Sequence, residues 1–271
     1  MTVHASIRPT AVAGLFYPDE GSQLIEDVLS MIESAPAALP KKPKALIAPH
    51  AGYIYSGSTA AAAYARLAPW GDTIERVVLL GPSHRVPLRG LALPSCDAFA
   101  TPLGWVPVDR AACAAIRPLR QVSLNDNAHA AEHSLEVHLP FLQAVLDHFS
   151  LVPLVVGEST AEEVAEVLDQ LWGDEQTLIV VSTDLSHYLP YRTAQYIDQG
   201  TGNAILGFAT DILTDQACGA HSLNGFLLAA ARHGLDAELV KLCNSGDSAG
   251  DRERVVGYGA FAFYPQELLH A

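Results

Sequence analysis

Three short apolar runs in this sequence show no polar alternation, and each is followed within a few residues by side chains that can ligate a metal or move a proton. The runs carry β-branched residues and extend over Ala45 to Ala48, Val77 to Leu80 and Leu178 to Val181. Strands of a parallel sheet that is covered on both faces have this pattern. The side chains that follow the runs are His50, His84, Asp184 and His187. Because ligands bind outside the carboxyl ends of such strands, we expect these side chains to meet in one crevice.

The alternation of strand-like and helix-like segments predicts an α/β fold with a largely parallel central sheet flanked by helices. The strands that end near His50, His84 and Asp184 are expected to be parallel neighbours, because right-handed β-α-β crossovers are strongly preferred. Helices are predicted at Ser22 to Ile32, Ser58 to Leu67, Ala111 to Ile116, Leu135 to Phe149, Ala161 to Trp172, Thr193 to Ala209 and Asn224 to His233. Further strands are predicted at Leu151 to Val156, Ala237 to Leu242 and Arg254 to Tyr264.

The length of 271 residues, 49% of them hydrophobic, suits one large core, so we expect a single domain over residues 1–271. Residues 89–110 are rich in Pro, Gly and aromatic side chains and show no helical period. They are expected to form a small annex of loops and short strands that borders the crevice or a subunit contact.

Charge and cysteine content exclude several classes of protein. Acidic residues outnumber basic ones by 30 to 16, a net charge of -14, so neither nucleic acid nor an anionic membrane surface is an expected partner. No segment has the pattern of a signal peptide or a membrane span, and we expect a soluble, cytoplasmic protein. The four cysteines lie far apart, which indicates neither a disulfide framework nor a structural zinc site.

The paired histidines favour a metal centre. Two imidazoles at equivalent strand ends, with one carboxylate and open positions, suit non-haem Fe(II), and the same donors also suit zinc or manganese. Asp184 and Asp247 are candidate carboxylate ligands, and Cys243 is a candidate thiol ligand.

Residues 129–133 match the pattern H-x-x-E-H, in which one helix of the inverted zincins offers both imidazoles to zinc. Asn125 to Asn127 upstream and Pro140 downstream leave the extent of such a helix open. A second interpretation is that Glu132, His133 and Glu136 share one helical face and form a wall of the crevice. There they would orient the metal-bound histidines, move protons or contact the substrate.

Two other groups have competing interpretations. Tyr53, close after His50, either lines a substrate pocket or packs in the core. Cys218, next to Gly219, is either an activated thiol or a buried small side chain, and burial is the commoner state.

Several spaced motifs resemble the Memo family. They are Arg8 to Pro18, Ala48 to Gly57, Gly81 to His84, Glu132 to Glu136, Ser182 to His187, Asn244 to Asp247 and Val255 to Tyr258. The resemblance extends from about Arg8 to Tyr264. Prokaryotic members of this family are known as the B component of a three-part system, so the resemblance implies a radical-SAM protein and an AMMECR-type protein as partners.

The Memo family is similar in fold to the class III extradiol dioxygenases, non-haem iron enzymes that open catechol rings. The resemblance implies His50 and His84 as the paired metal ligands. It also implies that His187 takes the place of the histidine that handles protons in those dioxygenases, with Asp184 beside it.

The resemblance leaves the third ligand open. In animal members this position is a cysteine, and counting back from Tyr258 places it at Ser248, next to Asp247, while Cys243 lies five residues too early. We therefore favour Asp247, which restores the two-histidine, one-carboxylate set of the dioxygenases, with Asp184 as the competing ligand.

Two functions from different classes follow from these residues. The first is an iron enzyme performing O2-dependent or other redox chemistry on a small organic molecule. The second is a non-catalytic module that binds a peptide or protein in the same crevice, since Memo proteins have also been described as adaptors. A zinc-assisted hydrolase is a third alternative.

Overall fold

Parallel strands form the centre of the main sheet in the computed structural model, which describes residues 5–36 and 41–266. The strands of the described chain are β1 (Ile7–Arg8), β2 (Ala45–Ala48), β3 (Arg76–Pro82), β4 (Leu91–Leu93), β5 (Ala98–Thr101), β6 (Gly104–Pro107), β7 (Val122–Leu124), β8 (Ser150–Val156), β9 (Thr177–Ser182), β10 (His187–Leu189), β11 (Leu235–Asn244) and β12 (Val255–Pro265). The main sheet has the order β10-β12-β2-β9-β3-β8-β4-β7, and β11 pairs with β12.

The predicted parallel neighbours are confirmed. Strand β9 lies between β2 and β3 and is parallel to both, with Ala48 opposite Ser182 and Leu80 opposite Val181. The three strands therefore end nearly level. His50, His84 and Asp184 each stand two residues beyond the last residue of their strand, so the register itself brings them to one edge of the sheet.

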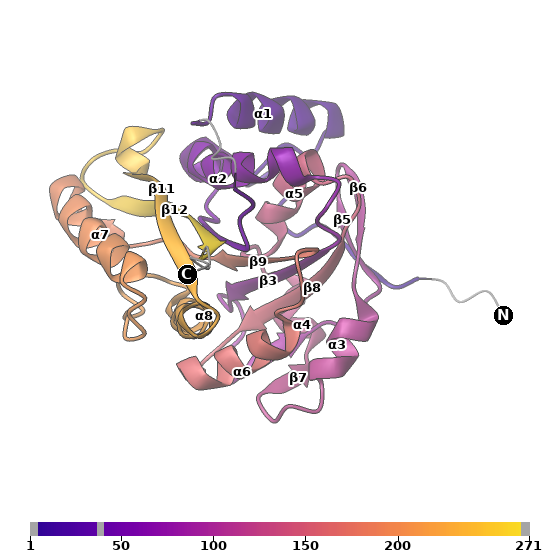
Figure 1. The fold of residues 1–271 in the computed structure, drawn as a ribbon. Coiled ribbons are helices and arrows are strands. Elements are labelled where there is room, and N and C mark those ends of the chain that lie inside the picture. The colour runs from indigo at the N-terminus through magenta and orange to yellow at the C-terminus, as the bar shows by residue number, and fades with distance from the viewer. Residues whose placement is uncertain (1–4, 37–40, 267–271) are drawn as a thin grey trace.

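Helices cover both faces of this sheet (Figure 1). They are α1 (Gly21–Glu33), α2 (Ser58–Tyr64), α3 (Arg110–Ile116), α4 (Asp126–Ala130), α5 (Leu139–Val145), α6 (Ala161–Leu171), α7 (Tyr191–Leu206) and α8 (Ala220–Arg232). Helix α2 packs on one face with α1 and α5, whereas α6 and α8 pack together on the opposite face. The central strands are buried by this arrangement, which explains why their sequences show no alternation.

The helix predicted over Leu135 to Phe149 begins four residues later, at Leu139, and ends earlier, at Val145. A 3₁₀ turn, η3 (Glu136–His138), precedes α5, which begins at Leu139 and has Pro140 in its first turn. Proline lacks the N–H that a helix interior needs but is tolerated in the first turn, so the helix begins there rather than being kinked. Glu132 and His133 therefore lie in an irregular turn and do not share a helical face with Glu136.

The annex is divided between two sheets. Strand β4 joins the edge of the main sheet, while β5 and β6 form a separate three-stranded sheet with β1. None of the described residues from Arg89 to Val108 lines the cavity at the strand ends, so the expected contact with the crevice is not found. The alternative, a subunit contact, stays a prediction.

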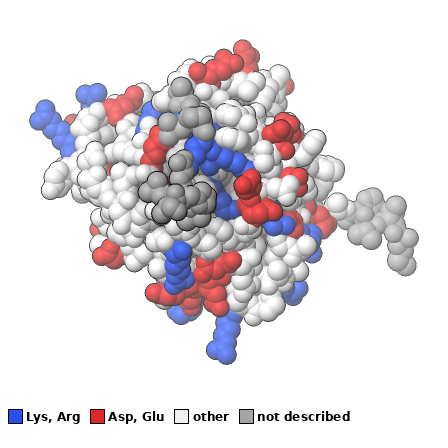
Figure 2. Space-filling model, in the orientation of Figure 1, with Lys and Arg blue, Asp and Glu red and all other residues white. Residues whose placement is uncertain are grey.

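Charged side chains of both signs are scattered over the face seen in Figure 2, where much of the surface is uncharged. None of the helices in the described chain combines the length and the apolar character needed to cross a bilayer.

Candidate metal centre

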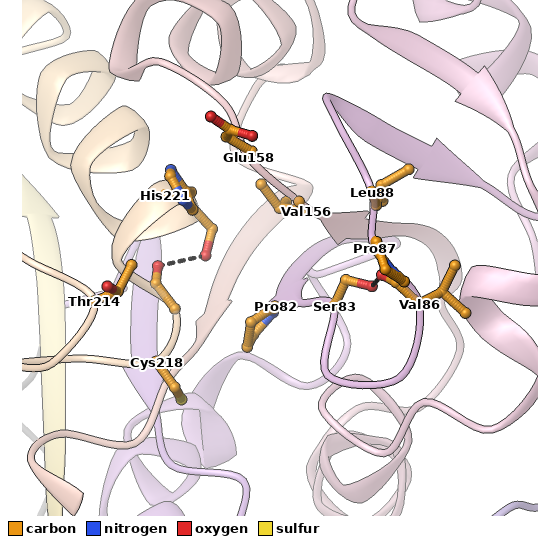
Figure 3. Close-up of a pocket in the computed structure, with 13 residues that line it drawn as sticks. Pro82, Ser83, Val86, Pro87, Leu88, Val156, Glu158, Thr214, Cys218 and His221 are labelled. Carbon is orange, nitrogen blue, oxygen red and sulfur yellow. Dashed lines mark hydrogen bonds between the residues drawn. The ribbon is translucent and has the colours of Figure 1, made fainter.

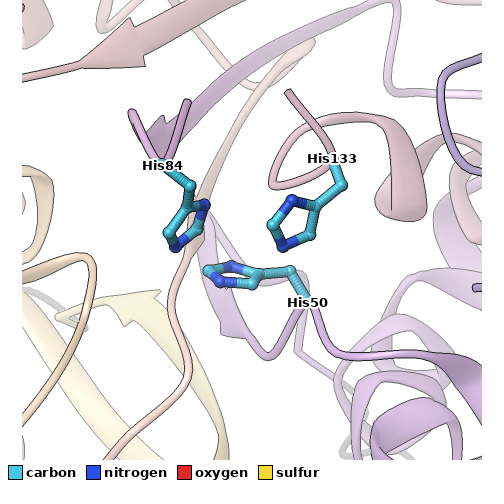
Figure 4. Close-up of side chains that lie close together, drawn as sticks. All are labelled: His50, His84 and His133. Carbon is cyan, nitrogen blue, oxygen red and sulfur yellow. The ribbon is translucent and has the colours of Figure 1, made fainter. Parts of the chain in front are cut away.

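Three imidazoles converge at the carboxyl edge of the sheet (Figure 4). His50 follows β2, His84 follows β3, and His133 comes from the turn between α4 and η3. One ring nitrogen from each lies within 4.8 Å of the other two. Nitrogens bound to one tetrahedral ion at about 2.1 Å lie roughly 3.4 Å apart, so an ion would draw these rings slightly together.

Ser182, the last residue of β9, orients the ring of His50. Its hydroxyl donates to the Ser134 carbonyl oxygen over 2.6 Å and lies 2.6 Å from His50 Nδ1. Because the hydroxyl has one proton, it must accept from His50 Nδ1–H, which leaves the lone pair on Nε2. Burial, reinforced by His84 and His133, holds the pKa of His50 well below its ordinary value. The ring is therefore neutral and can ligate a metal.

Glu132 orients His84 in the same manner. Its Oε1 lies 2.9 Å from His84 Nδ1, and its Oε2 accepts the His84 backbone N–H over 2.6 Å. Burial opposes ionisation of this carboxyl, but the hydrogen bonds from His84 and from the Ser134 backbone N–H outweigh it and hold the pKa of Glu132 at about 2. An ionised carboxylate accepts Nδ1–H, so His84 also presents Nε2 as a free ligand atom.

His133 completes the group. Its Nδ1 is buried and has no hydrogen-bond partner among the described residues, although Glu132 Oε1 lies 3.3 Å away. The Phe16 ring packs on it with ring centroids 4.8 Å apart. Burial lowers the pKa of His133 to about 4, which keeps the imidazole neutral. Three converging imidazoles, two of them kept neutral by burial and one with a buried nitrogen that has no partner among the described residues, fit a transition-metal ion.

Asp184, His187 and Cys218 surround this group. Asp184 Oδ1 accepts the His50 backbone N–H over 2.8 Å, and its Oδ2 lies 4.0 Å from His50 Nε2. Burial raises the pKa of Asp184 to about 7. Cys218 Sγ lies 3.3 Å from His50 Nε2, and burial raises the pKa of this thiol to about 12, so it is not an activated thiolate.

An open cavity of about 790 Å³ adjoins the three histidines. Asp184, His187 and Tyr55 line it together with the imidazoles. A separate cavity of about 370 Å³ lies on another side of the strand ends (Figure 3). Cys218 lines this second cavity and contacts His50, so its side chain forms part of the wall between this cavity and the three histidines.

The structure does not bring Asp247 or Cys243 into the group of three. Asp247 caps the short turn η4 (Ser245–Asp247), where Oδ2 accepts the Asn244 N–H and Oδ1 accepts the Tyr191 hydroxyl. Cys243 lies on β11, and its Sγ is 2.9 Å from Thr59 Oγ1. Neither lines the cavity, whereas His133, expected to act from outside the coordination sphere, is the third member of the group that could hold a metal ion.

Two residues expected to contact substrate are structural instead. Glu136 is fully buried and accepts hydrogen bonds from Arg8 and Tyr17. Tyr53 donates its hydroxyl to the Val137 carbonyl over 2.7 Å and does not line the cavity. The inverted-zincin alternative fails as well, because α4 ends at Ala130 and His129 Nε2 faces the Ala92 carbonyl at 2.9 Å.

Sequence reasoning missed the residues that orient the histidines. Ser182 is the last residue of a predicted strand and lies opposite Ala48, two residues before His50. A hydroxyl at this strand end was the available signal. Ser134 contributes through its carbonyl, which carries no sequence signal.

Comparison with known proteins agrees with these motifs. The family described as Memo-like protein matches residues 8–262. A MEMO1 family protein of Archaeoglobus fulgidus is 37% identical over 277 residues, covering 95% of this chain and 99% of the relative. Those of Aquifex aeolicus and Thermotoga maritima are each 35% identical, covering 95% and 93% of this chain and 99% and 97% of the respective relative. The motifs, the family match and the full-length similarity together establish that this chain belongs to the Memo family.

Proposed function

We propose that this protein is a metal-dependent enzyme in which His50, His84 and His133 hold one divalent transition-metal ion and the adjoining cavity holds a small organic substrate. The observation that carries the proposal is the convergence of three ring nitrogens within 4.8 Å in the wall of an open cavity. Three protein ligands leave positions on the ion for other ligands, as in catalytic rather than structural sites.

We favour Fe(II) and redox chemistry. Bound Fe(II) would supply electron transfer and polarisation of substrate oxygen atoms. The protein's own groups orient the ligands: Ser182 and Glu132 hold His50 and His84 in the required tautomers. His187 lines the same cavity without belonging to the group of three, a position suited to holding or moving a proton on the substrate.

A zinc-assisted hydrolase is the second candidate, and the donor set favours it specifically. Three histidines with an open position form the zinc site of carbonic anhydrase. The carboxylate expected to complete an iron-type set is absent from the described ligand group. In this case the ion would activate water instead of supplying redox chemistry.

Metal analysis of protein purified with and without oxygen tests the proposal. We expect equimolar metal in the wild type, loss of that metal in His50→Ala and His133→Ala, and its retention in His148→Ala, a matched control on an exposed histidine outside the cavity. Unchanged metal in both cavity variants would refute the site. Asp247→Ala is expected to retain its metal. Loss of metal in this variant would support Asp247 as the third ligand.

Oxygen uptake distinguishes the two enzyme classes. Iron recovered under anaerobic conditions, together with substrate-dependent oxygen consumption, supports the redox function. Zinc recovered under both conditions, without oxygen consumption, supports hydrolysis. His187→Ala is expected to keep its metal and to lower turnover by about a hundredfold, the usual range for a lost acid or base.

A further inference from the structure

We infer that the ligand of the cavity is an anion with an apolar or aromatic body, whose acidic group is bound by the guanidinium groups of Arg85 and Arg254. The inference rests on the proposed function, since it names the substrate class of the same cavity. Its basis is the charge and shape of the cavity wall.

The two arginines are unpaired within the cavity although the chain as a whole has a net charge of -14. Arg85 makes no side-chain hydrogen bond or ion pair with any described residue. The guanidinium carbon of Arg254 lies 5.1 Å from the centroid of the Tyr188 ring and has no carboxylate partner among the described residues. Both side chains are exposed, so their donors remain available to a ligand.

The carboxylates in the same wall, Asp184 and Asp251, form no ion pair with these arginines in the described part of the chain. Asp184 is buried, 4% exposed, and its Oδ1 is bonded to the His50 backbone N–H. Asp251 uses one carboxylate oxygen to accept the backbone N–H groups of Glu253 and Arg254. A divalent ion would add two further positive charges, so the loaded cavity would attract an anion and repel a cation.

Aromatic side chains form part of the wall. Phe16, Tyr55 and Tyr188 line the cavity. Leu15 and Ile54, next to them in the chain, are 82% and 70% exposed, and the Tyr53 N–H bonded to the Phe16 carbonyl holds these two loops together. An exposed apolar rim around a cavity is typical of a ligand site.

Tyr188 has a left-handed backbone, with φ of 58°, immediately after His187. Residues other than glycine rarely adopt this conformation, and those that do cluster at ligand sites. The Tyr188 ring lies 5.8 Å from the His187 ring between centroids, and the guanidinium carbon of Arg254 lies 5.1 Å from the Tyr188 centroid. One wall of the cavity thus offers an aromatic face and a cation together.

A matched pair of fluorescent probes tests the inference. One is 8-anilinonaphthalene-1-sulfonate, and the other is N-phenyl-1-naphthylamine, which lacks only the sulfonate. We expect the wild type to prefer the sulfonate and the variant Arg85→Gln/Arg254→Gln to bind it about tenfold or more weakly, with unchanged affinity for the neutral probe. Arg117→Gln/Arg120→Gln, with the same charge change on exposed arginines outside the cavity, is the control and should match the wild type.

Failure of the sulfonate to bind, equal affinity for both probes, or an equal loss in the control variant would overturn the inference. Tyr188→Ala should lower the affinity for both probes to the same extent. Unchanged affinities would show that the Tyr188 ring does not contact the ligand. Because Arg85 adjoins His84, Arg254→Gln alone serves as the second variant and should weaken the sulfonate several-fold.

Metal content measured on the same samples separates the two proposals. A wild type that binds no metal but prefers the sulfonate would refute the metal enzyme and leave the anion site. A metal-loaded wild type without that preference would refute the anion site alone.

Discussion

Glu132 and Glu136 are four residues apart and nearly equally buried, at 2% and 0% exposure, yet they serve different parts of the molecule. Glu132 accepts from the side chain and backbone of His84 and from two neighbouring backbone N–H groups. Glu136 accepts from Arg8, from the Tyr17 hydroxyl over 2.6 Å, and from two backbone N–H groups of the N-terminal segment. The first carboxylate orients a candidate metal ligand, and the second ties the N-terminal segment to the domain.

Residue type, spacing and burial therefore do not determine the role of a carboxylate; the groups that donate hydrogen bonds to it do. A buried carboxyl group is costly unless its oxygens accept hydrogen bonds, and both glutamates obtain several. Arg8 contacts both regions, since its other donors reach the carbonyl oxygens of Glu132 and His129 at 2.6 and 3.0 Å.

Replacement of Glu136 is expected to have the largest effect. Glu136→Gln leaves the buried Arg8 guanidinium without its counter-charge, which costs about 3–5 kcal/mol of unfolding free energy. Urea unfolding at neutral pH measures this loss, and Glu26→Gln on the exposed face of α1 is the control. The folded fraction should keep its full metal content. A loss of metal would show that Glu136, like Glu132, supports the metal site.

Replacement of Glu132 should weaken metal binding more than folding. Glu132→Gln removes the anionic acceptor of His84 Nδ1–H, and loss of such a partner typically lowers metal affinity by about 10–100-fold. Competition with a chelator measures the affinity. Unaltered affinity would show that Glu132 is a structural carboxylate like Glu136.

Acid should destabilise the metal-free protein through the histidines that flank this segment. Burial lowers the pKa of His138 to about 3 and that of His129 to about 4. Between pH 6.5 and these values the unfolded chain binds more protons, so stability falls as the pH is lowered. His138 alone should account for about 2 kcal/mol between pH 7 and pH 5. Unfolding curves of His138→Gln should lack this part of the pH dependence, and an identical slope would contradict the assignment.

The smallest effect is expected at Tyr53. Tyr53→Phe removes one hydrogen bond to the Val137 carbonyl and should cost about 1 kcal/mol of stability. Both naphthalene probes should bind as before, because Tyr53 does not line the cavity. Tyr55→Phe, at a residue that does line it, is the companion variant. Weaker probe binding in Tyr53→Phe would indicate that Tyr53 contacts the ligand after all.

The strands and half of the site could be predicted because both depend on local pattern. Unbroken apolar runs rich in β-branched residues are typical of strands buried on both faces of a parallel sheet. Such a sheet brings the residues that follow its strands to one edge. His50, His84 and Asp184 were located in this way. The partnerships with a radical-SAM protein and an AMMECR-type protein stay predictions.

The third histidine of the group could not be predicted, because it does not follow a strand. His133 lies in a turn without periodicity, and its approach to His50 depends on Ser134, whose carbonyl accepts the Ser182 hydroxyl. Counting back from Tyr258 pointed to Asp247, but distance along a loop does not specify the direction of a side chain. The Asp247 carboxylate accepts the Asn244 backbone N–H and so points into the turn η4 instead of toward the histidines.

Hydrophobic pattern acts over a few residues, so the α/β class, the parallel neighbours and two histidines of the group follow from the order of residues alone. The packing of distant segments brings His133 to these two histidines, buries Glu136 and Tyr53 in the core, and places at the cavity two arginines that have no ion-pair partner among the described residues. These outcomes depend on contacts between segments far apart in the sequence, such as Arg8 with Glu136, 128 residues away. Which donor a buried polar group meets is set by packing, and packing is a property of the whole chain.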